Sequence, residues 1–244
     1  MTNIKNDLYM ILDKNNIKRV TCVTGHFGSG KTEFSLNYAI KLKEAGLKVT
    51  IIDFDIVNPY FRTKDVQDYL KGLGIKVISP EFANLNIENP CLPPEVYSAF
   101  DDKSSYVIFD VGGDEDGAAP LGFYHNYFVK EDYDMFFVLN EKRLLTQSVE
   151  DTKVIFDEIT YVSRLKPTAV VSNAHLMQFT DAEVISRGAQ LSEDFACSVG
   201  LPLKYVAIDN RKEEEFKNSS EIPDKYKSCM FPMELFVGPG FTDR

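Results

Sequence analysis

Short runs of apolar residues alternate along the chain with longer segments in which apolar residues recur every three or four positions. The short runs contain few polar positions, which is typical of strands covered on both faces of a parallel sheet. The long segments have the period of helices that bury one face. This alternation predicts an α/β fold built from β-α-β units. Seven strands are predicted, at Val20–Thr24, Val49–Asp53, Ile75–Ile78, Tyr106–Asp110, Met135–Leu139, Ala169–Ser172 and Leu203–Ile208.

Four helices are predicted between these strands, at Thr32–Ala45, Lys64–Lys71, Leu145–Tyr161 and Asp181–Val199. Glycine follows three of them directly, at positions 46, 72 and 200, and glycine suits the left-handed residue that often ends a helix. Right-handed crossovers between parallel strands place helices on both faces of the sheet. We therefore expect three layers, with a mostly parallel central sheet of about seven strands between two layers of helices.

The two ends of the chain lie outside this pattern. Residues 1–17 carry Ile4, Leu8 and Ile11 at helical spacing, which predicts an amphipathic helix docked on the sheet. Proline and glycine interrupt residues 222–244, so an extended, packed tail is expected there. A chain of 244 residues is long enough for one sizeable core and too short for two comfortable domains. Residues 1–244 are therefore expected to form a single domain.

Charge and hydropathy narrow the functional classes. Lys and Arg total 27 against 37 Asp and Glu, and the net charge is -10. This acidic balance disfavours a surface that neutralises nucleic-acid phosphates. No stretch approaches the roughly 20 apolar residues of a membrane span, and the first residues lack the basic and then apolar order of a secretory signal. We expect a cytoplasmic protein without a nucleic-acid or membrane partner.

The clearest chemical signal is the segment Gly25-His26-Phe27-Gly28-Ser29-Gly30-Lys31-Thr32, which matches G-x-x-x-x-G-K-[ST]. It follows a predicted strand and opens a predicted helix, as a phosphate-binding loop (P-loop) must. The eight residues are expected to bind a nucleotide, with backbone N–H groups around the phosphate oxygens. Lys31 is expected to reach the β- and γ-phosphates, and Thr32 to offer its hydroxyl to Mg²⁺. A glycine-rich turn that only caps a helix would not explain the Lys and Thr that follow.

Acidic residues end two of the other predicted strands. Asp53 ends the second strand and Asp55 follows it, at the edge where open α/β sheets bind ligands. As an alternative, both cap the following turn. Asp110 ends the fourth strand and begins the sequence D-x-x-G, which closes with Gly113. There an acid is expected to hold Mg²⁺ through water, and the glycine amide to approach the γ-phosphate. The acidic residues 114–116 are expected to form a solvated loop.

These motifs occur in one order along the chain, from about Val20 to Ile208, and in that order they resemble the ParA/MinD-like (CobQ/MinD/ParA) group of P-loop NTPases. The resemblance implies the P-loop NTPase fold, with ATP and Mg²⁺ as ligands. It also implies that Asp55 orients the attacking water, that Asp53 supports the magnesium shell, and that Asn173 contacts the base. Lys31 and Asp55 are accordingly the predicted catalytic residues.

The chain departs from the group at one position. His26 stands where the group has a second lysine, which reaches the nucleotide of a partner subunit. The nucleotide-bridged dimer of the group is therefore not carried over, and a homodimer stays open. A guanine-reading NKxD motif would place Asp at position 176, where this chain has Leu176, so adenine is expected over guanine. For Arg143 a phosphate contact and a plain surface position are both open.

The first functional hypothesis is a Mg²⁺- and ATP-binding switch with slow hydrolysis. Nucleotide state would reshape residues Asp55–Arg62 and Gly112–Tyr127 for a protein partner. The alternative is an ATP-dependent small-molecule kinase or ligase of the dethiobiotin-synthetase type, whose P-loops also lack the second lysine. In that case Phe123–Tyr127 and Asn89–Pro94 would line an acceptor pocket, and a phosphorylated product would decide for the enzyme.

Overall fold

A single sheet of eight strands forms the centre of the computed structural model, which describes residues 17–55, 64–79 and 94–236. The strands run in the order β3-β2-β4-β1-β5-β6-β7-β8, and every neighbouring pair is parallel. Their bounds are β1 (Val20–Thr24), β2 (Val49–Phe54), β3 (Lys76–Ile78), β4 (Tyr106–Val111), β5 (Asp134–Leu139), β6 (Ala169–Ser172), β7 (Leu203–Asp209) and β8 (Met230–Met233).

The predicted α/β architecture is confirmed. The seven predicted strands agree with β1 to β7 within one residue at each end. The eighth strand was not predicted, because Pro232 lies inside it. Proline cannot donate a ladder hydrogen bond and is tolerated where a strand has only one neighbour, and β8 is the edge strand beside β7. The prediction of a wholly extended segment at 222–244 was also wrong, since Asp224–Lys227 forms a short helix.

Nine α-helices are described. They are α2 (Lys31–Glu44), α3 (Lys64–Gly72), α4 (Pro94–Asp101), α5 (Asp114–Ala118), α6 (Leu121–Lys130), α7 (Val149–Ser163), α8 (Ala182–Ser198), α9 (Glu213–Asn218) and α10 (Asp224–Lys227). The four predicted helices correspond to α2, α3, α7 and α8. Helix α7 begins four residues later than predicted because the Ser148 side chain caps it by accepting from the Asp151 amide.

The predicted loop Gly112–Tyr127 is mostly helical, since α5 and most of α6 occupy it. Helix α6 buries Leu121, Tyr124 and Phe128 at helical spacing, a signal that the sequence did contain. The other predicted switch segment, Asp55–Arg62, lies outside the described residues beyond its first position. The predicted N-terminal helix at 1–17 also lies outside them except for Ile17, which packs on the core.

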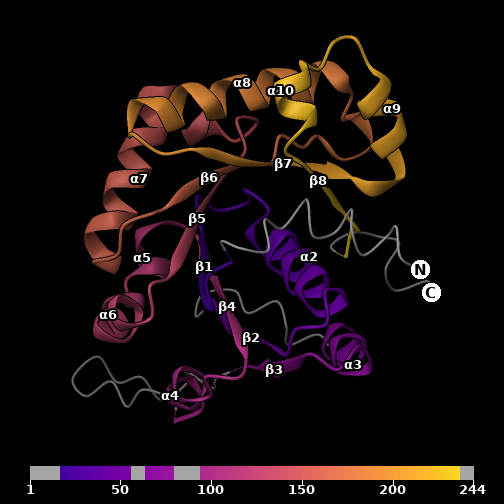
Figure 1. The fold of residues 1–244 in the computed structure, drawn as a ribbon. Coiled ribbons are helices and arrows are strands. Elements are labelled where there is room, and N and C mark those ends of the chain that lie inside the picture. Colours follow the sequence, from indigo (N-terminus) through magenta and orange to yellow (C-terminus); the bar gives the residue numbers. More distant parts are fainter. Residues whose placement is uncertain (1–16, 56–63, 80–93, 237–244) are drawn as a thin grey trace.

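Two apolar cores lie on the two faces of the sheet. Neighbouring strand residues point to opposite faces, so that Phe136 belongs to one core and Phe137 to the other. Helices α2 and α3 cover the first face, and α4, α6, α7 and α8 cover the second (Figure 1). A third, smaller cluster joins α8, α9 and α10 to β7 and β8. In the part of the chain that the structure describes, no helix has the length and apolar character needed to cross a membrane.

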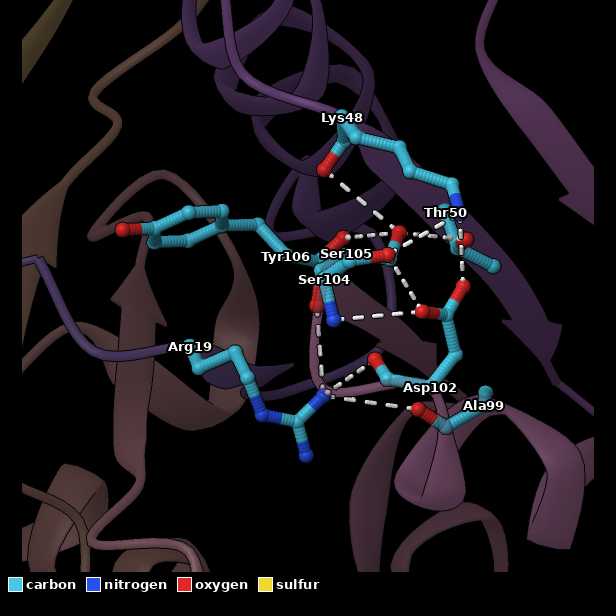
Figure 2. Close-up of polar contacts among 8 residues, drawn as sticks. All are labelled: Arg19, Lys48, Thr50, Ala99, Asp102, Ser104, Ser105 and Tyr106. Carbon is cyan, nitrogen blue, oxygen red and sulfur yellow. Dashed lines mark hydrogen bonds and ion pairs between the residues drawn. The ribbon is translucent and has the colours of Figure 1, made fainter.

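Arg19 fastens α4 to the sheet at the edge where the strands begin (Figure 2). Its Nη1 donates to the carbonyl oxygens of Ala99 (3.4 Å), Asp102 (3.2 Å) and Ser105 (3.2 Å), and its Nε donates to Glu131 Oε2 (2.9 Å). The last carbonyl oxygens of a helix receive no hydrogen bond from the helix itself. The guanidinium supplies several donors to them at once, which an ammonium group cannot do.

We expect Arg19→Lys to lower the free energy of unfolding by about 2 kcal/mol, because one ammonium cannot satisfy several half-buried carbonyl groups. Chemical denaturation measures this change. The matched control is Lys18→Ala, because Lys18 forms an exposed ion pair with Asp132. That variant should change stability by less than about 0.5 kcal/mol. Equal effects of the two variants would contradict the role given to Arg19.

Candidate functional site

A cavity of about 310 Å³ lies at the edge of the sheet where the parallel strands end. Segments far apart in sequence form its walls: the P-loop and the start of α2, the ends of β2, β5 and β6, and the end of β8 with the residues after it. Its lining residues are Phe27, Gly28, Ser29, Gly30, Lys31, Thr32, Glu33, Asp55, Asn140, Arg143, Asn173, His175, Met177, Met233 and Leu235. The volume is within the range of small-molecule sites.

The P-loop wraps closely against its surroundings. The Ser29 amide donates to the His26 carbonyl oxygen (3.1 Å), and the first intrahelical bond of α2 runs from Phe34 N to Gly30 O (3.0 Å). The amides of residues 31–33 therefore have no intrahelical acceptor, which makes a helix N-terminus suited to an anion. Gly30 has a φ of 87°, and a Cβ there would lie 2.1 Å from Asn173 Nδ2. Only glycine fits this position.

Lys31 is folded back onto its own loop. Its side chain is 7% exposed, and Nζ donates to the His26 carbonyl oxygen (3.0 Å). Burial lowers the pKa of Lys31, while the nearby Asp110 and Asp55 carboxylates oppose that shift. The buried ammonium thus lies beside the cavity with a neutral acceptor, which a phosphate group can replace with a stronger, charge-assisted contact.

Asp110 lies beneath the first turn of α2. Its two carboxylate oxygens accept hydrogen bonds from Thr32 Oγ1 (2.7 Å) and Ser35 Oγ (2.9 Å). Burial raises the pKa of Asp110 to about 6, and the Asp55 charge adds to this, whereas the two hydroxyls and Lys31 act against it. The structure therefore brings together Thr32 and Asp110, two of the three predicted magnesium residues. Hydroxyl and carboxylate oxygens are the hard donors that Mg²⁺ prefers.

Asp53 and Asp55 have different surroundings. Asp53 lies opposite Asp110 in the register of β2 and β4 and is buried. Its Oδ1 accepts from the Asp55 amide (3.3 Å), which is the turn contact named as the alternative for this pair. Asp55 itself lines the cavity, so it is the acid of this pair that a ligand can reach.

Residues 113 and 114 bring the segment after β4 against the P-loop. A Cβ on Gly113 would lie 2.8 Å from Phe27 Cα. Asp114 Oδ1 lies 2.5 Å from His26 Nδ1 and accepts from the Phe27 amide (3.2 Å). The predicted solvated loop was therefore wrong for Asp114, which opens α5 with a left-handed φ of 62°. His26, at the position of the missing lysine, contacts its own chain.

Asn173 and Arg143 hold the P-loop from the other side. Asn173 Nδ2 donates to the Ser29 carbonyl oxygen (2.7 Å), and Arg143 Nε donates to the Gly28 carbonyl oxygen (2.8 Å). Both residues also line the cavity. Arg143 therefore lies at the site, where it adds a second positive charge beside Lys31.

Six lining residues were missed by the sequence analysis: Glu33, Asn140, His175, Met177, Met233 and Leu235. Glu33 follows the P-loop motif, Asn140 follows β5, and His175 and Met177 follow Asn173 on one loop, so the position in the chain was a signal for these four. Burial lowers the pKa of His175, which favours the neutral imidazole, and its Nδ1 accepts from the Met177 amide (3.2 Å). Nothing in the sequence indicated Met233 and Leu235, because β8 was not predicted.

The predicted acceptor pocket is not part of this cavity. Within the described residues, none of Phe123–Tyr127 lines it, and Tyr124 is fully buried among other aromatic rings. Residues 89–93 lie outside the described part of the chain.

Comparison with known proteins finds the fold but no family. No family model matches the chain, and no curated protein matches it in sequence. Among solved structures, the cell division protein FtsY from Thermotoga maritima is 17% identical with a TM-score of 0.55, over 84% of this chain and 68% of that one. The signal recognition particle receptor FtsY from Elizabethkingia anophelis, in complex with GDP, is 18% identical with a TM-score of 0.51, over 98% and 70%.

Chloroplast FtsY from Physcomitrella patens is 16% identical with a TM-score of 0.52, over 82% of this chain and 65% of that one. The chain has the P-loop NTPase fold. FtsY belongs to a different branch of these proteins from the ParA/MinD-like group, so the assignment to that group is not confirmed. At these identities the likeness is one of fold, and the roles of the site residues remain predictions.

We expect Asp110→Asn to stabilise the nucleotide-free protein more at about pH 7.5 than at about pH 4.5. The folded-state pKa of about 6 exceeds the ordinary 3.8. Between these values the folded chain keeps a proton that the unfolded chain releases. The folded state therefore loses on the order of 3 kcal/mol in total as the pH rises from below about 3.8 to above about 6, and about 2 kcal/mol of this between about pH 4.5 and about pH 7.5. Asparagine does not ionise, so it does not incur this loss.

Chemical denaturation of both proteins at the two pH values measures the difference. Asp116→Asn is the matched control, because Asp116 is exposed on α5; its effect should not change with pH in this way. A stability difference between Asp110→Asn and the parent that is the same at both pH values would contradict the buried, proton-binding state of Asp110.

Proposed function

We propose that the chain is a Mg²⁺-dependent, ATP-binding switch with slow hydrolysis, of the kind found in the ParA/MinD-like group. The observation that carries the proposal is the buried Lys31 beside the Thr32–Asp110 hydrogen bond, at the wall of a cavity formed by the P-loop. A phosphate-binding loop, a cation and oxygen donors for a metal are adjacent there. The free cysteines among the described residues fit a reducing compartment such as the cytoplasm.

The chain's own residues divide the chemistry in this proposal. The amides of the P-loop and the Lys31 ammonium bind the β- and γ-phosphates, and Arg143 adds charge at the same edge. Thr32 and Asp110 would hold Mg²⁺, with Asp53 supporting them, and the metal would supply positive charge that neutralises the phosphates. Asp55 positions a water molecule, which attacks the γ-phosphorus. The bond from that phosphorus to the β–γ bridging oxygen then breaks, and ADP and inorganic phosphate leave.

The output of the switch is proposed to run through the segment after β4. Gly113 and Asp114 contact Phe27 and His26 of the P-loop, and α5 begins at the second of these residues. A change at the phosphate end of the cavity therefore acts directly on α5 and then on α6, where a protein partner would bind. The His26 contact lies within one chain, so this route does not need a second subunit, and a homodimer stays open.

Lys31→Ala should abolish the stabilisation that ATP gives to the folded protein, because the buried ammonium at the phosphates is lost and Arg143, the other cation of the lining, is held at the Gly28 carbonyl oxygen. For the parent protein, ATP at about 100 times its Kd should add about 2.7 kcal/mol, seen as a rise in melting temperature. Lys43→Ala makes the same change in the last turn of the same helix and should leave that rise intact. An ATP-induced rise that persists in Lys31→Ala would remove the P-loop assignment.

ATP should bind more tightly than GTP, because Leu176 stands where a guanine-reading acid would be. Competition of the two nucleotides for one site, followed by the displacement of a fluorescent ATP analogue, measures the preference directly. Tighter binding of GTP would reverse the assignment of the base while leaving the phosphate site in place.

Asp55→Asn should lower the rate of ATP hydrolysis by about 100-fold and leave ATP affinity within a few-fold, because asparagine keeps the size of the side chain but loses the charge that positions the water. Asp110→Asn should instead weaken the dependence of binding on Mg²⁺. Parallel measurements of affinity and phosphate release across a magnesium titration separate the two roles. Asp116→Asn again controls for charge. Hydrolysis at the parental rate in Asp55→Asn would leave Asp55 as a turn residue only.

A further inference from the structure

The segment Met233–Phe236, here called the C-terminal strap, is fastened to the P-loop helix. Asn37 of α2 pairs with the backbone of Glu234 in both directions: Asn37 Nδ2 donates to Glu234 O (2.8 Å), and Glu234 N donates to Asn37 Oδ1 (2.7 Å). The Phe236 amide donates to the Glu33 carboxylate (2.9 and 3.0 Å). Glu33 and Asn37 are one helical turn apart, so they present these partners from the same face of α2.

These hydrogen bonds fix the position of Leu235, because the backbone of the residue on each side of it is bonded to α2. Phe236 is buried, with its ring 5.5 Å from that of Tyr69, and Met233 is buried at the end of β8. Leu235 lies between these two anchors, and both Leu235 and Met233 line the cavity. The strap is thus a preformed wall, and a preformed wall binds a ligand without the cost of ordering it.

The lining of the cavity combines two chemistries. The helix N-terminus, Lys31 and Arg143 suit an anion. Met177, Met233 and Leu235 add apolar surface, together with the imidazole of His175. A nucleoside triphosphate has the same division, since a polyanion is joined to a flat heterocycle with two apolar faces. Glu33 follows Thr32 directly and also holds the strap, so the first turn of α2 connects the P-loop to the strap.

We propose that the C-terminal strap forms the apolar wall of the nucleoside subsite, with Leu235 and Met233 in contact with the base or ribose and Asn37 as the positioning residue that holds them. The inference rests on the proposed nucleotide-binding function. It adds that the nucleoside part of the ligand, separately from the phosphates, is recognised by residues from the far end of the chain.

The test compares two ligands, Mg²⁺-ATP and Mg²⁺-tripolyphosphate, by isothermal titration calorimetry with the full chain. Tripolyphosphate carries the phosphates without a nucleoside. Leu235→Ala should weaken ATP binding by about tenfold, through the loss of apolar contact, and change tripolyphosphate binding by less than about twofold. Asn37→Ala should act in the same selective way, although Asn37 does not line the cavity.

Leu73→Ala is the matched control, since Leu73 directly follows α3, is 38% exposed and does not line the cavity. It should change neither affinity. Melting temperatures confirm that each variant is folded, and Leu235→Ala decides alone if Asn37→Ala does not fold, because Leu235 is only half-buried.

Two failures are distinguishable. If the parent protein binds neither ATP nor tripolyphosphate, the proposed function falls, and this inference falls with it. If the parent binds both ligands and Leu235→Ala leaves the ratio of the two affinities unchanged, the phosphate site stands and the strap is not the nucleoside wall. A selective loss for ATP in Leu235→Ala that is absent in Leu73→Ala supports the inference.

Discussion

The site depends on a carboxylate buried beneath the P-loop helix. Asp110 ends a central strand and is held by the hydroxyls of Thr32 and Ser35, which come from the first and second turns of α2. Burying this acid is unfavourable, as its raised pKa indicates. Lys31 is buried nearby and its pKa is shifted in the opposite direction. The sheet and α2 are therefore connected through buried polar groups. A bound cation would stabilise the Asp110 carboxylate, and a bound anion would stabilise the Lys31 ammonium.

Polar contacts from neighbouring segments also hold the backbone of the P-loop in place. Asn173 and Arg143 hold two P-loop carbonyl groups from one side, and Asp114 holds the Phe27 amide from the other. With these contacts made, the remaining amides at the start of α2 face a ready-formed cavity. The bonded carbonyl groups and the Phe27 amide thus hold the shape of the loop, whereas the amides at the start of α2 remain available to a ligand.

Most of the sheet could be predicted because buried parallel strands lack alternation, and the cores on both faces explain why. Strand β8 was missed because a proline, here Pro232, normally argues against a strand. The strand tolerates it because β8 lies at the edge of the sheet. The closeness of Lys31, Thr32 and Asp110 could be predicted from their motifs, since each motif carries its own strand and helix context. Asn173 was predicted to contact a base, and its bond to Ser29 could not be read from sequence because it joins residues 144 positions apart.

The pairing of Asn37 with Glu234 joins residues separated by 197 positions. During synthesis the P-loop leaves the ribosome well before the strap does. A nascent chain that ends before β8 has the P-loop and Lys31 without the lining residues Met233 and Leu235. A ligand that needs both parts of the lining can therefore stabilise the fold only after β8 and the strap have been made.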